Sequence, residues 1–163
     1  MAAFNYNEMF YYESGNIYWK INASRNTPVG TLAGSKDKSR GYWSVHIKGK
    51  SFKRSRIIYE MHHGPIPSGM QIDHINGVTS DDRIENLRIA TQSENQMNRG
   101  IMKHNSSGVR GVSWDPRKQR WRAQVQINGK CRHLGYFKEI HEAAIAAESG
   151  RRSLFGEFAR VGD

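Results

Sequence analysis

Apolar and polar residues alternate without a break from residue 121 to residue 128, and this alternation is the strongest constraint that the sequence sets on its own fold. The apolar positions are Trp121, Ala123, Val125 and Ile127, and the polar positions between them are Arg122, Gln124, Gln126 and Asn128. A strand with this period of two turns one set toward a core and the other away from it. We therefore expect a strand over residues 120–127 with one apolar face and one face of Arg and Gln side chains.

Two further strands and a helix are expected around this strand. Residues 109–114 and 131–136 have strand-like composition, and Pro116 and the pair Asn128-Gly129 mark the turns on either side of residues 120–127. Asn-Gly is the strongest short hairpin signal. Residues 140–152 follow, and their paired alanines suit a helix that packs closely on a sheet. The pattern predicts a three-stranded antiparallel sheet backed by one helix, with Gly150 weakening the end of that helix.

The preceding part of the chain predicts an α+β fold of short elements. Residues 42–47 and 51–54 flank a Lys-Gly-Lys turn and predict a hairpin, and residues 56–62 predict a helix that ends before Gly64. An extended run at 70–72, an Asn-Gly turn and a capping box at 91–94 then predict strand, turn, strand and helix. We divide the chain into a basic β-rich segment (1–68), a ββα core (69–102) and, after a polar linker, a C-terminal domain (103–163).

Charge indicates the kind of partner. The net charge is +10, with eight basic residues and one acid between residues 36 and 56, whereas residues 73–99 hold five acids and three arginines. A polyanion such as nucleic acid is the simplest partner for such a chain, and a surface kept soluble by lysines is the alternative. Cys131 is the only cysteine, so neither an internal disulfide nor a multi-cysteine zinc site is expected.

The acidic window contains residues suited to a hard divalent cation. The Asp73 carboxylate and the Asn95 amide oxygen are donors of the type that such a cation prefers, and His74 can take a proton from an attacking water. Water and phosphate oxygens would complete the coordination. The alternative is purely structural: Asp73 and Asn86 cap turns, and His74 packs within a strand.

Residues 56–99, RIIYEMHHGPIPSGMQIDHINGVTSDDRIENLRIATQSENQMNR, resemble the HNH endonuclease family, in the branch found in phages and introns. The resemblance implies a ββα-metal fold, with His74 as the general base, Asp73 and Asn95 as metal ligands, and Asn86 orienting the loop that holds His74. The cofactor would be Mg²⁺ or Mn²⁺, since an amide oxygen replaces the family's last histidine. Ser55 and Asp82 depart from the usual His and Asn, and we expect both to tune the site from outside the ligand set.

The C-terminal residues resemble the Apetala-two domain of plant ethylene-response factors. The shared landmarks are Arg110-Gly111-Val112, Trp121, Leu134-Gly135, Phe137 and Ala143-Ala144. The resemblance implies a sheet that lies in the DNA major groove and makes contacts at Arg110, Gln124, Gln126 and His133. Arg122 is a further base-contact candidate. A polar, solvated sheet face is the alternative.

Other basic residues are expected to contact phosphate. They are Arg117, Lys118 and Arg120 in the C-terminal domain, and Lys48, Lys50, Lys53, Arg54 and Arg56 in the N-terminal segment.

Taken together, these features predict a metal-dependent endonuclease of double-stranded DNA, acting as a monomer or homodimer and resembling homing enzymes. Two alternatives remain: a DNA-binding regulator with an inactive nuclease core, and a non-catalytic packaging accessory. Residues 1–15 lack a signal-peptide pattern, and no apolar run approaches the roughly 20 residues that cross a bilayer. We expect a soluble, intracellular protein without a membrane partner, located in the bacterial cytoplasm if phage-encoded.

Overall fold

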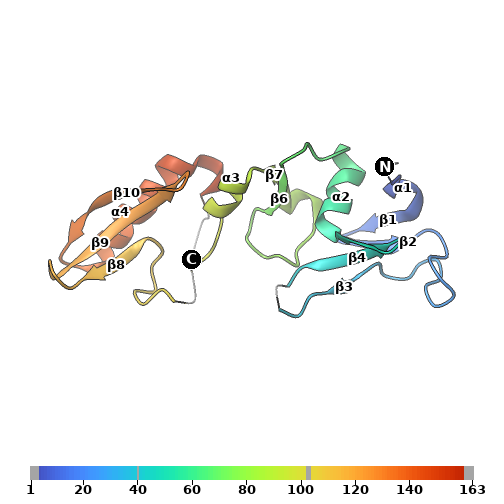
Figure 1. The fold of residues 1–163 in the computed structure, drawn as a ribbon, viewed down its shortest axis with the longest axis horizontal. Coiled ribbons are helices and arrows are strands. Elements are labelled where there is room, and N and C mark those ends of the chain that lie inside the picture. Colours follow the sequence, from blue (N-terminus) through green and yellow to red (C-terminus); the bar gives the residue numbers. More distant parts are fainter. Residues whose placement is uncertain (1–3, 40, 102–103, 160–163) are drawn as a thin grey trace. The chain divides into compact units, whose positions relative to one another are not determined.

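The computed structural model describes residues 4–39, 41–101 and 104–159, which form two compact units, residues 1–90 and 91–163. The elements of the first unit are α1 (Tyr6–Met9), β1 (Phe10–Glu13), β2 (Asn16–Trp19), β3 (Ser35–Lys36), β4 (Trp43–Ile47), β5 (Lys50–Lys53), α2 (Arg54–His63), β6 (Gln71–His74), the 3₁₀ turn η1 (Ile84–Asn86) and β7 (Leu87–Ala90). Those of the second unit are α3 (Gln92–Met97), β8 (Val112–Asp115), β9 (Arg120–Ile127), β10 (Lys130–Phe137), α4 (Ile140–Phe155) and the 3₁₀ turn η2 (Gly156–Phe158). Figure 1 labels most of these elements.

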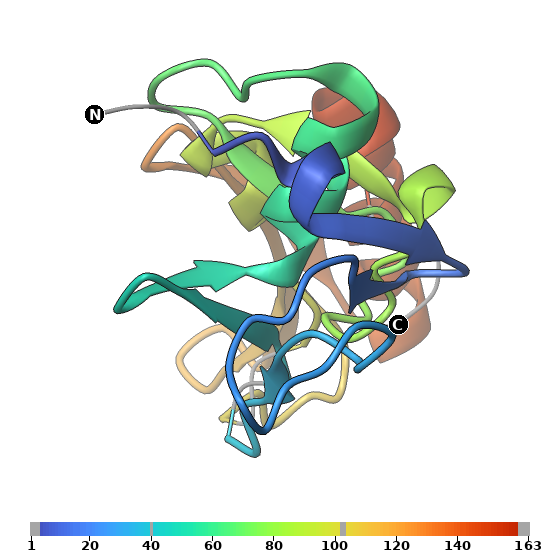
Figure 2. The ribbon, with the colours of Figure 1, turned by 90° about the vertical axis from the view of Figure 1, so that its right-hand side faces the viewer.

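Three small antiparallel sheets build the first unit. They are the pair β1–β2, the sheet β3–β4–β5 and the pair β6–β7. The hairpin predicted around Lys48-Gly49-Lys50 is confirmed as β4–β5, with Lys48 and Gly49 in the left-handed region at its turn. Helix α2, green in Figure 2, packs against β4 and β5 and begins two residues before the predicted start.

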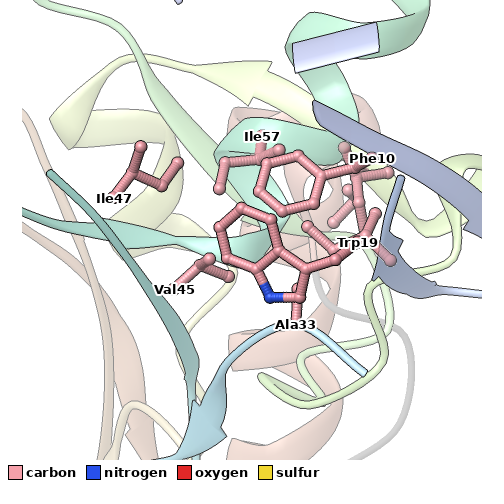
Figure 3. Packing of buried hydrophobic residues seen from close by; sticks show 9 residues of the cluster. Phe10, Trp19, Ala33, Val45, Ile47 and Ile57 are labelled. Atoms are coloured by element: carbon pink, nitrogen blue, oxygen red, sulfur yellow. The ribbon is translucent and has the colours of Figure 1, made fainter. Parts of the chain in front are cut away.

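An aromatic and aliphatic cluster holds this unit together. Phe10 and Trp19 pack with ring centroids 4.5 Å apart, and Val45, Ile47 and Ile57 surround them (Figure 3). These side chains come from β1, β2, β4 and α2, so one core joins elements that lie far apart in the sequence. Burial of such a cluster is the main stabilising contribution in a chain whose described cysteine is a free thiol.

The second unit matches the predicted sheet and helix closely. Strand β9 has the predicted limits, β10 and β8 flank it in antiparallel register, and Asn128 and Gly129 take positive φ at the β9–β10 turn. Ala123 and Val125 point into the core, and Ala143 and Ala147 of α4 cover Ala123. The α+β fold class and the C-terminal sheet on a helix are therefore confirmed.

Helix α4 runs through Gly150, as predicted, and ends at Phe155, three residues beyond the predicted end at Arg152. A Cβ atom at position 150 would lie 2.6 Å from Leu134 Cδ1, so glycine lets the helix approach β10 closely. The loss of helix propensity is offset here by packing. None of the helices that the structure describes is both long and apolar enough to cross a membrane.

Candidate functional site

The β6–β7 hairpin carries the two residues that the sequence placed at the centre of the chemistry. Asp73 and His74 are consecutive on β6, opposite Arg88 and Leu87 on β7, and both are 4% exposed. Arg88 reaches across the hairpin: its Nε and Nη2 atoms lie 2.9 and 2.8 Å from Asp73 Oδ2. Both nitrogens contact the same carboxylate oxygen, and these charge-assisted contacts restrict the orientation of the Asp73 side chain.

His74 is held by a second acidic residue. Its Nε2 atom lies 2.8 Å from Asp82 Oδ1, and Asp82 Oδ2 accepts a hydrogen bond from Arg54 Nε at 2.7 Å. The side chains of Arg54 and Asp82 are both 2% exposed. Asp82 is therefore a direct partner of the imidazole, where the sequence indicated only a peripheral, tuning position.

Arg54 corrects one prediction. The sequence placed it among the phosphate-contacting residues of the basic hairpin, because it follows Lys53 and precedes Arg56. In the structure its guanidinium is buried and also donates to Asn16 Oδ1 at 2.8 Å. A buried, fully engaged guanidinium has no access to a phosphate backbone, so Arg54 belongs to the site around His74 instead.

Asn86 organises the loop that leaves β6. Its Oδ1 atom accepts from the Asn76 backbone N–H at 3.0 Å, while its Nδ2 atom donates to the Asp81 carbonyl oxygen at 2.7 Å. The Ile75 N–H adds a bond to the Asn86 carbonyl at 2.9 Å. These contacts span both ends of the loop between His74 and Asp82, which is the arrangement needed for the orienting role that the resemblance implied.

Asp81 forms an exposed ion pair beside this loop. Arg83 Nε donates to Asp81 Oδ1 at 2.8 Å, and Asn76 Nδ2 donates to Asp81 Oδ2 at 2.8 Å. The hydrogen bonds from Arg83 hold the pKa of the Asp81 carboxyl below its usual range, and the Asn76 bond acts in the same direction. Asp81 therefore stays ionised down to strongly acidic pH.

The predicted cation site is incomplete on protein groups alone. Within the described ranges no group of three or more His, Cys, Asp and Glu side chains is placed to hold a metal ion. Asp73 supplies one hard carboxylate donor, and because a carboxylate offers about four lone-pair sites, its contact with Arg88 does not exhaust it. Asn95 lies on α3 in the second unit, so its joint role with Asp73 stays a prediction. The donor chemistry fits a cation that takes most of its ligands from water and substrate.

Helix α3 begins as predicted. Thr91 is its N-cap, its hydroxyl accepts from the Glu94 N–H at 3.2 Å, and the Glu94 carboxylate accepts from the Thr91 N–H at 2.7 Å. Asn95 thus lies in the first turn of the helix. Met97, at its end, packs with Val125 and Phe155 of the second unit.

The predicted polar side chains of the C-terminal sheet lie on the face opposite α4. Gln124 is paired with His133, Gln126 with Cys131, and Arg122 with both Ser113 and Tyr136. Cross-strand partners share a face, so this polar face is built from the side chains of three strands. Arg122 Nη2 lies 3.3 Å from Ser113 Oγ, a contact that the sequence did not indicate.

The remaining basic residues have different surroundings. Lys118 Nζ lies 3.8 Å from the centre of the Tyr136 ring, and Arg117, its neighbour in the exposed β8–β9 turn, donates its backbone N–H to Asp115 Oδ1. Arg110 is not on the sheet face itself. It lies ahead of β8, and its Nη2 donates to the Gln96 carbonyl of α3 at 3.3 Å.

In the first unit, Lys48, Lys50 and Lys53 are exposed on the β4–β5 hairpin, and the Lys53 ammonium lies 4.1 Å from the centre of the Tyr42 ring. Arg56 is half-buried and donates to the Met70 carbonyl at 3.3 Å. The three lysines thus form a basic edge whose contact with DNA stays a prediction.

The sequence did not identify the link between Arg54 and Asp82. The two residues are 28 positions apart, and only the fold brings them together. One signal was available: an acid replaces the usual Asn at position 82, and an arginine occupies a position next to the other departure, Ser55. An unusual acid at position 82 would need a buried cation to compensate it, and Arg54, beside the departure at Ser55, is one candidate in the sequence.

Comparison with known proteins gives two family matches on separate parts of the chain. The model of the HNH endonuclease family matches residues 52–97, and the model of the AP2 domain matches residues 107–157. No solved structure matches the chain.

Two viral relatives also match. Protein 3.8 of Escherichia phage T7 is 38% identical over 111 residues, which cover 68% of this chain and 91% of the phage protein. The uncharacterized HNH endonuclease L560 of Acanthamoeba polyphaga mimivirus is 32% identical over 105 residues; these cover 64% of this chain but 54% of the mimivirus protein, about half its length.

Proposed function

Because the chain belongs to the HNH endonuclease family and carries a C-terminal AP2 domain, we propose that it is a metal-dependent endonuclease that hydrolyses phosphodiester bonds in double-stranded DNA. The observation that supports this most strongly is that Asp73 and His74 are consecutive on β6 and that each side chain is oriented by a charged partner. A positioned carboxylate beside a positioned imidazole provides a cation ligand next to a base.

Each residue has a defined task in this proposal. His74 takes the proton from the water that attacks phosphorus, and Asn86 keeps the loop after β6 in the shape that presents His74. Asp73 and Asn95 hold a divalent cation, Mg²⁺ or Mn²⁺. When bound, that cation polarises the scissile phosphate and stabilises the departing oxygen. Arg88 restricts the orientation of the Asp73 carboxylate.

Site recognition is assigned to the C-terminal sheet. Arg122, Gln124, Gln126 and His133 share one face of β9 and β10, and Arg and Gln side chains form two-point contacts with guanine and adenine in the major groove. Arg110 is retained as a family contact position, and exposed Arg117, Lys118 and half-buried Arg120 beside the face would hold phosphates. A nuclease that selects its site through a separate domain suits a homing endonuclease of the phage type. We include this homing role in the proposal.

The test is incubation of the purified chain with supercoiled plasmid and with phage genomic DNA, in Mg²⁺, in Mn²⁺ and in EDTA. The proposal predicts nicked or linear products with either metal and intact DNA in EDTA. The ratio of nicked to linear product tells whether one or both strands are cut. Tight binding without cleavage under every condition would contradict the proposal and favour a DNA-binding regulator with an inactive core.

A further inference from the structure

A buried ion pair lies directly behind the proposed base. Asp82 bridges His74 Nε2, at 2.8 Å from its Oδ1, and Arg54 Nε, at 2.7 Å from its Oδ2. His74 is 4% exposed, and the other two side chains are 2% exposed. All three side chains are largely buried, so the contacts among them are strong and specific.

Arg54 is fixed on several sides, which makes it a permanent partner of Asp82. Its Nη1 donates to Asn16 Oδ1 at 2.8 Å, and its guanidinium carbon lies 4.4 Å from the centre of the Trp43 ring. An arginine is charged at every pH that a folded protein survives. Arg54 only donates, so Asp82 Oδ2 accepts from it in a charge-assisted hydrogen bond, and an ionised carboxylate can only accept hydrogen bonds.

We infer that Asp82, held by Arg54, is a positioning residue for His74 and fixes which ring nitrogen carries the proton. This inference rests on the proposed function, in which His74 is the base. Because Asp82 only accepts, Nε2 must be the protonated nitrogen of the neutral ring, and the lone pair then lies on Nδ1. Nδ1 is thus the atom that can take a proton from water.

Because Asp replaces the usual Asn at position 82, the His74 tautomer is set by a carboxylate and not by an amide. An Asn held by Arg54 through its oxygen would turn its NH₂ group toward the ring and favour a proton on Nδ1, whereas a carboxylate accepts from both Arg54 and Nε2. An acid buried there alone would be an uncompensated charge beside a site that must receive phosphate. Arg54 removes that problem, which explains why a second charged residue is buried at the same place.

The first readout separates positioning from DNA binding. We compare single-turnover cleavage rates at saturating protein, and Kd for the same DNA, in the parent and in Asp82→Ala, Asp82→Asn and Glu85→Gln. Glu85 is the matched control, a carboxylate three residues away that is 66% exposed. Asp82→Ala should lower the cleavage rate about 10–100-fold with Kd nearly unchanged. Asp82→Asn should also cleave more slowly than the parent, because its NH₂ group faces His74 and favours the other tautomer, and Glu85→Gln should match the parent.

The second readout does not require cleavage. In ¹⁵N-histidine-labelled protein, the ring signals distinguish the two neutral tautomers from each other and from the imidazolium, and His74→Gln identifies the His74 signals. The inference predicts a proton on Nε2 in the parent and a shift of the proton to Nδ1 in Asp82→Asn, because Arg54 Nε holds the amide oxygen and leaves the NH₂ group facing Nε2. A proton on Nδ1 in the parent would overturn it, as would an Asp82→Ala variant that folds and cleaves at the parent rate.

These readouts also distinguish the two proposals. The parent could cut no DNA and still carry the His74 proton on Nε2, with the proton moving to Nδ1 in Asp82→Asn. In that case the nuclease proposal fails and the positioning inference stands.

Discussion

Asp73 and His74 are neighbours on one strand, yet the orientation of each side chain depends on a different arginine. Asp73 is oriented by Arg88 from the facing strand β7, and His74 is oriented through Asp82 by Arg54 from helix α2. The two sets of contacts share no residue, so a substitution at Arg88 or at Arg54 directly breaks only one of them. The site therefore allows the contributions of orientation and of charge to be measured one residue at a time.

Replacement of Arg54 by Met should destabilise the first unit strongly. It leaves the Asp82 carboxylate buried without its cation, which costs about 3–5 kcal/mol in the free energy of unfolding. Arg56→Met is the control on the same helix, because Arg56 is 39% exposed and its contact with Glu60 is 3.9 Å long. That variant should lose about 1 kcal/mol or less. Urea unfolding followed by tryptophan fluorescence measures both, and equal losses would contradict the account.

The exposed Asp81–Arg83 pair should contribute to stability in acid. Hydrogen bonds from Arg83 lower the pKa of Asp81 in the folded state, so the contribution is fully present above the unfolded pKa of about 4. It is lost as the pH falls toward and through the folded pKa. Asp81→Asn should therefore flatten the fall of Tm between about pH 5 and pH 2. The account fails at this point if parent and variant lose Tm in parallel over that range.

At the scale of elements, the sequence predicted local structure well and distant contacts poorly. The alternation in β9, the Asn128-Gly129 turn and the Thr91 capping box each depend on residues within one element, and the structure contains all three. The Arg54–Asp82 contact depends on how α2 packs over a loop that follows β6, which no local pattern encodes. Such contacts are also why the role expected of Arg54 was wrong.

Helix α4 at Gly150 also depends on a tertiary contact that no local pattern encodes. Propensity alone predicts a weakened helix at a glycine, but the close approach to Leu134 is a tertiary contact. The positions of Asp73, His74 and Asn86 within the proposed nuclease core came from a resemblance over 44 residues, and their hydrogen-bond partners came from the fold.

Gly111 is the glycine on which the start of the C-terminal sheet depends most. Its φ is +77°, and a Cβ there would lie 2.4 Å from the Gln124 carbonyl oxygen, which belongs to β9 and cannot move alone. Gly129 has a similar φ of +74° but open space around it, so it is a matched control. Gly129→Ala should cost about 1–2 kcal/mol from backbone strain. Gly111→Ala adds a steric clash and should cost roughly 3 kcal/mol or more in thermal or urea unfolding; similar losses for the two would show that the approach to Gln124 is unimportant.

The polar sheet face should carry sequence discrimination. Gln126 is exposed on this face, whereas Ile145, 67% exposed, lies on α4 away from it. On a selected target, Gln126→Ala should reduce the preference over a mismatched site by about 1–3 kcal/mol. Ile145→Ala should leave this preference as it is in the parent. Competition binding at fixed salt measures this preference for the target over the mismatched site. Equal preferences in the two variants would show that Gln126 does not contact the bases.

At the scale of the whole molecule, the residues proposed for cleavage and those proposed for recognition lie mostly in different compact units. Residues 1–90 contain the paired Asp73 and His74 with their supporting cations, and residues 91–163 contain the polar sheet face and helix α3. The predicted limit at 102–103 falls outside the described residues, and the family matches end at residue 97 and begin at residue 107. Under the proposed function, mutations on β6 should affect cleavage and mutations on the polar sheet face should affect recognition, whereas Asn95 on α3 places one proposed cation ligand in the second unit.

The most direct test of the central claim compares cleavage and binding in His74→Ala and in the parent. With Mg²⁺ and saturating protein, the parent should cut DNA, and His74→Ala should cut at least about 100-fold more slowly, because it lacks the base. Both should bind the same DNA with nearly equal Kd, since the sheet face is unchanged. If His74→Ala cut DNA at the parent rate, His74 would not be the base, and the site built around Asp82 and Asp73 would need another role.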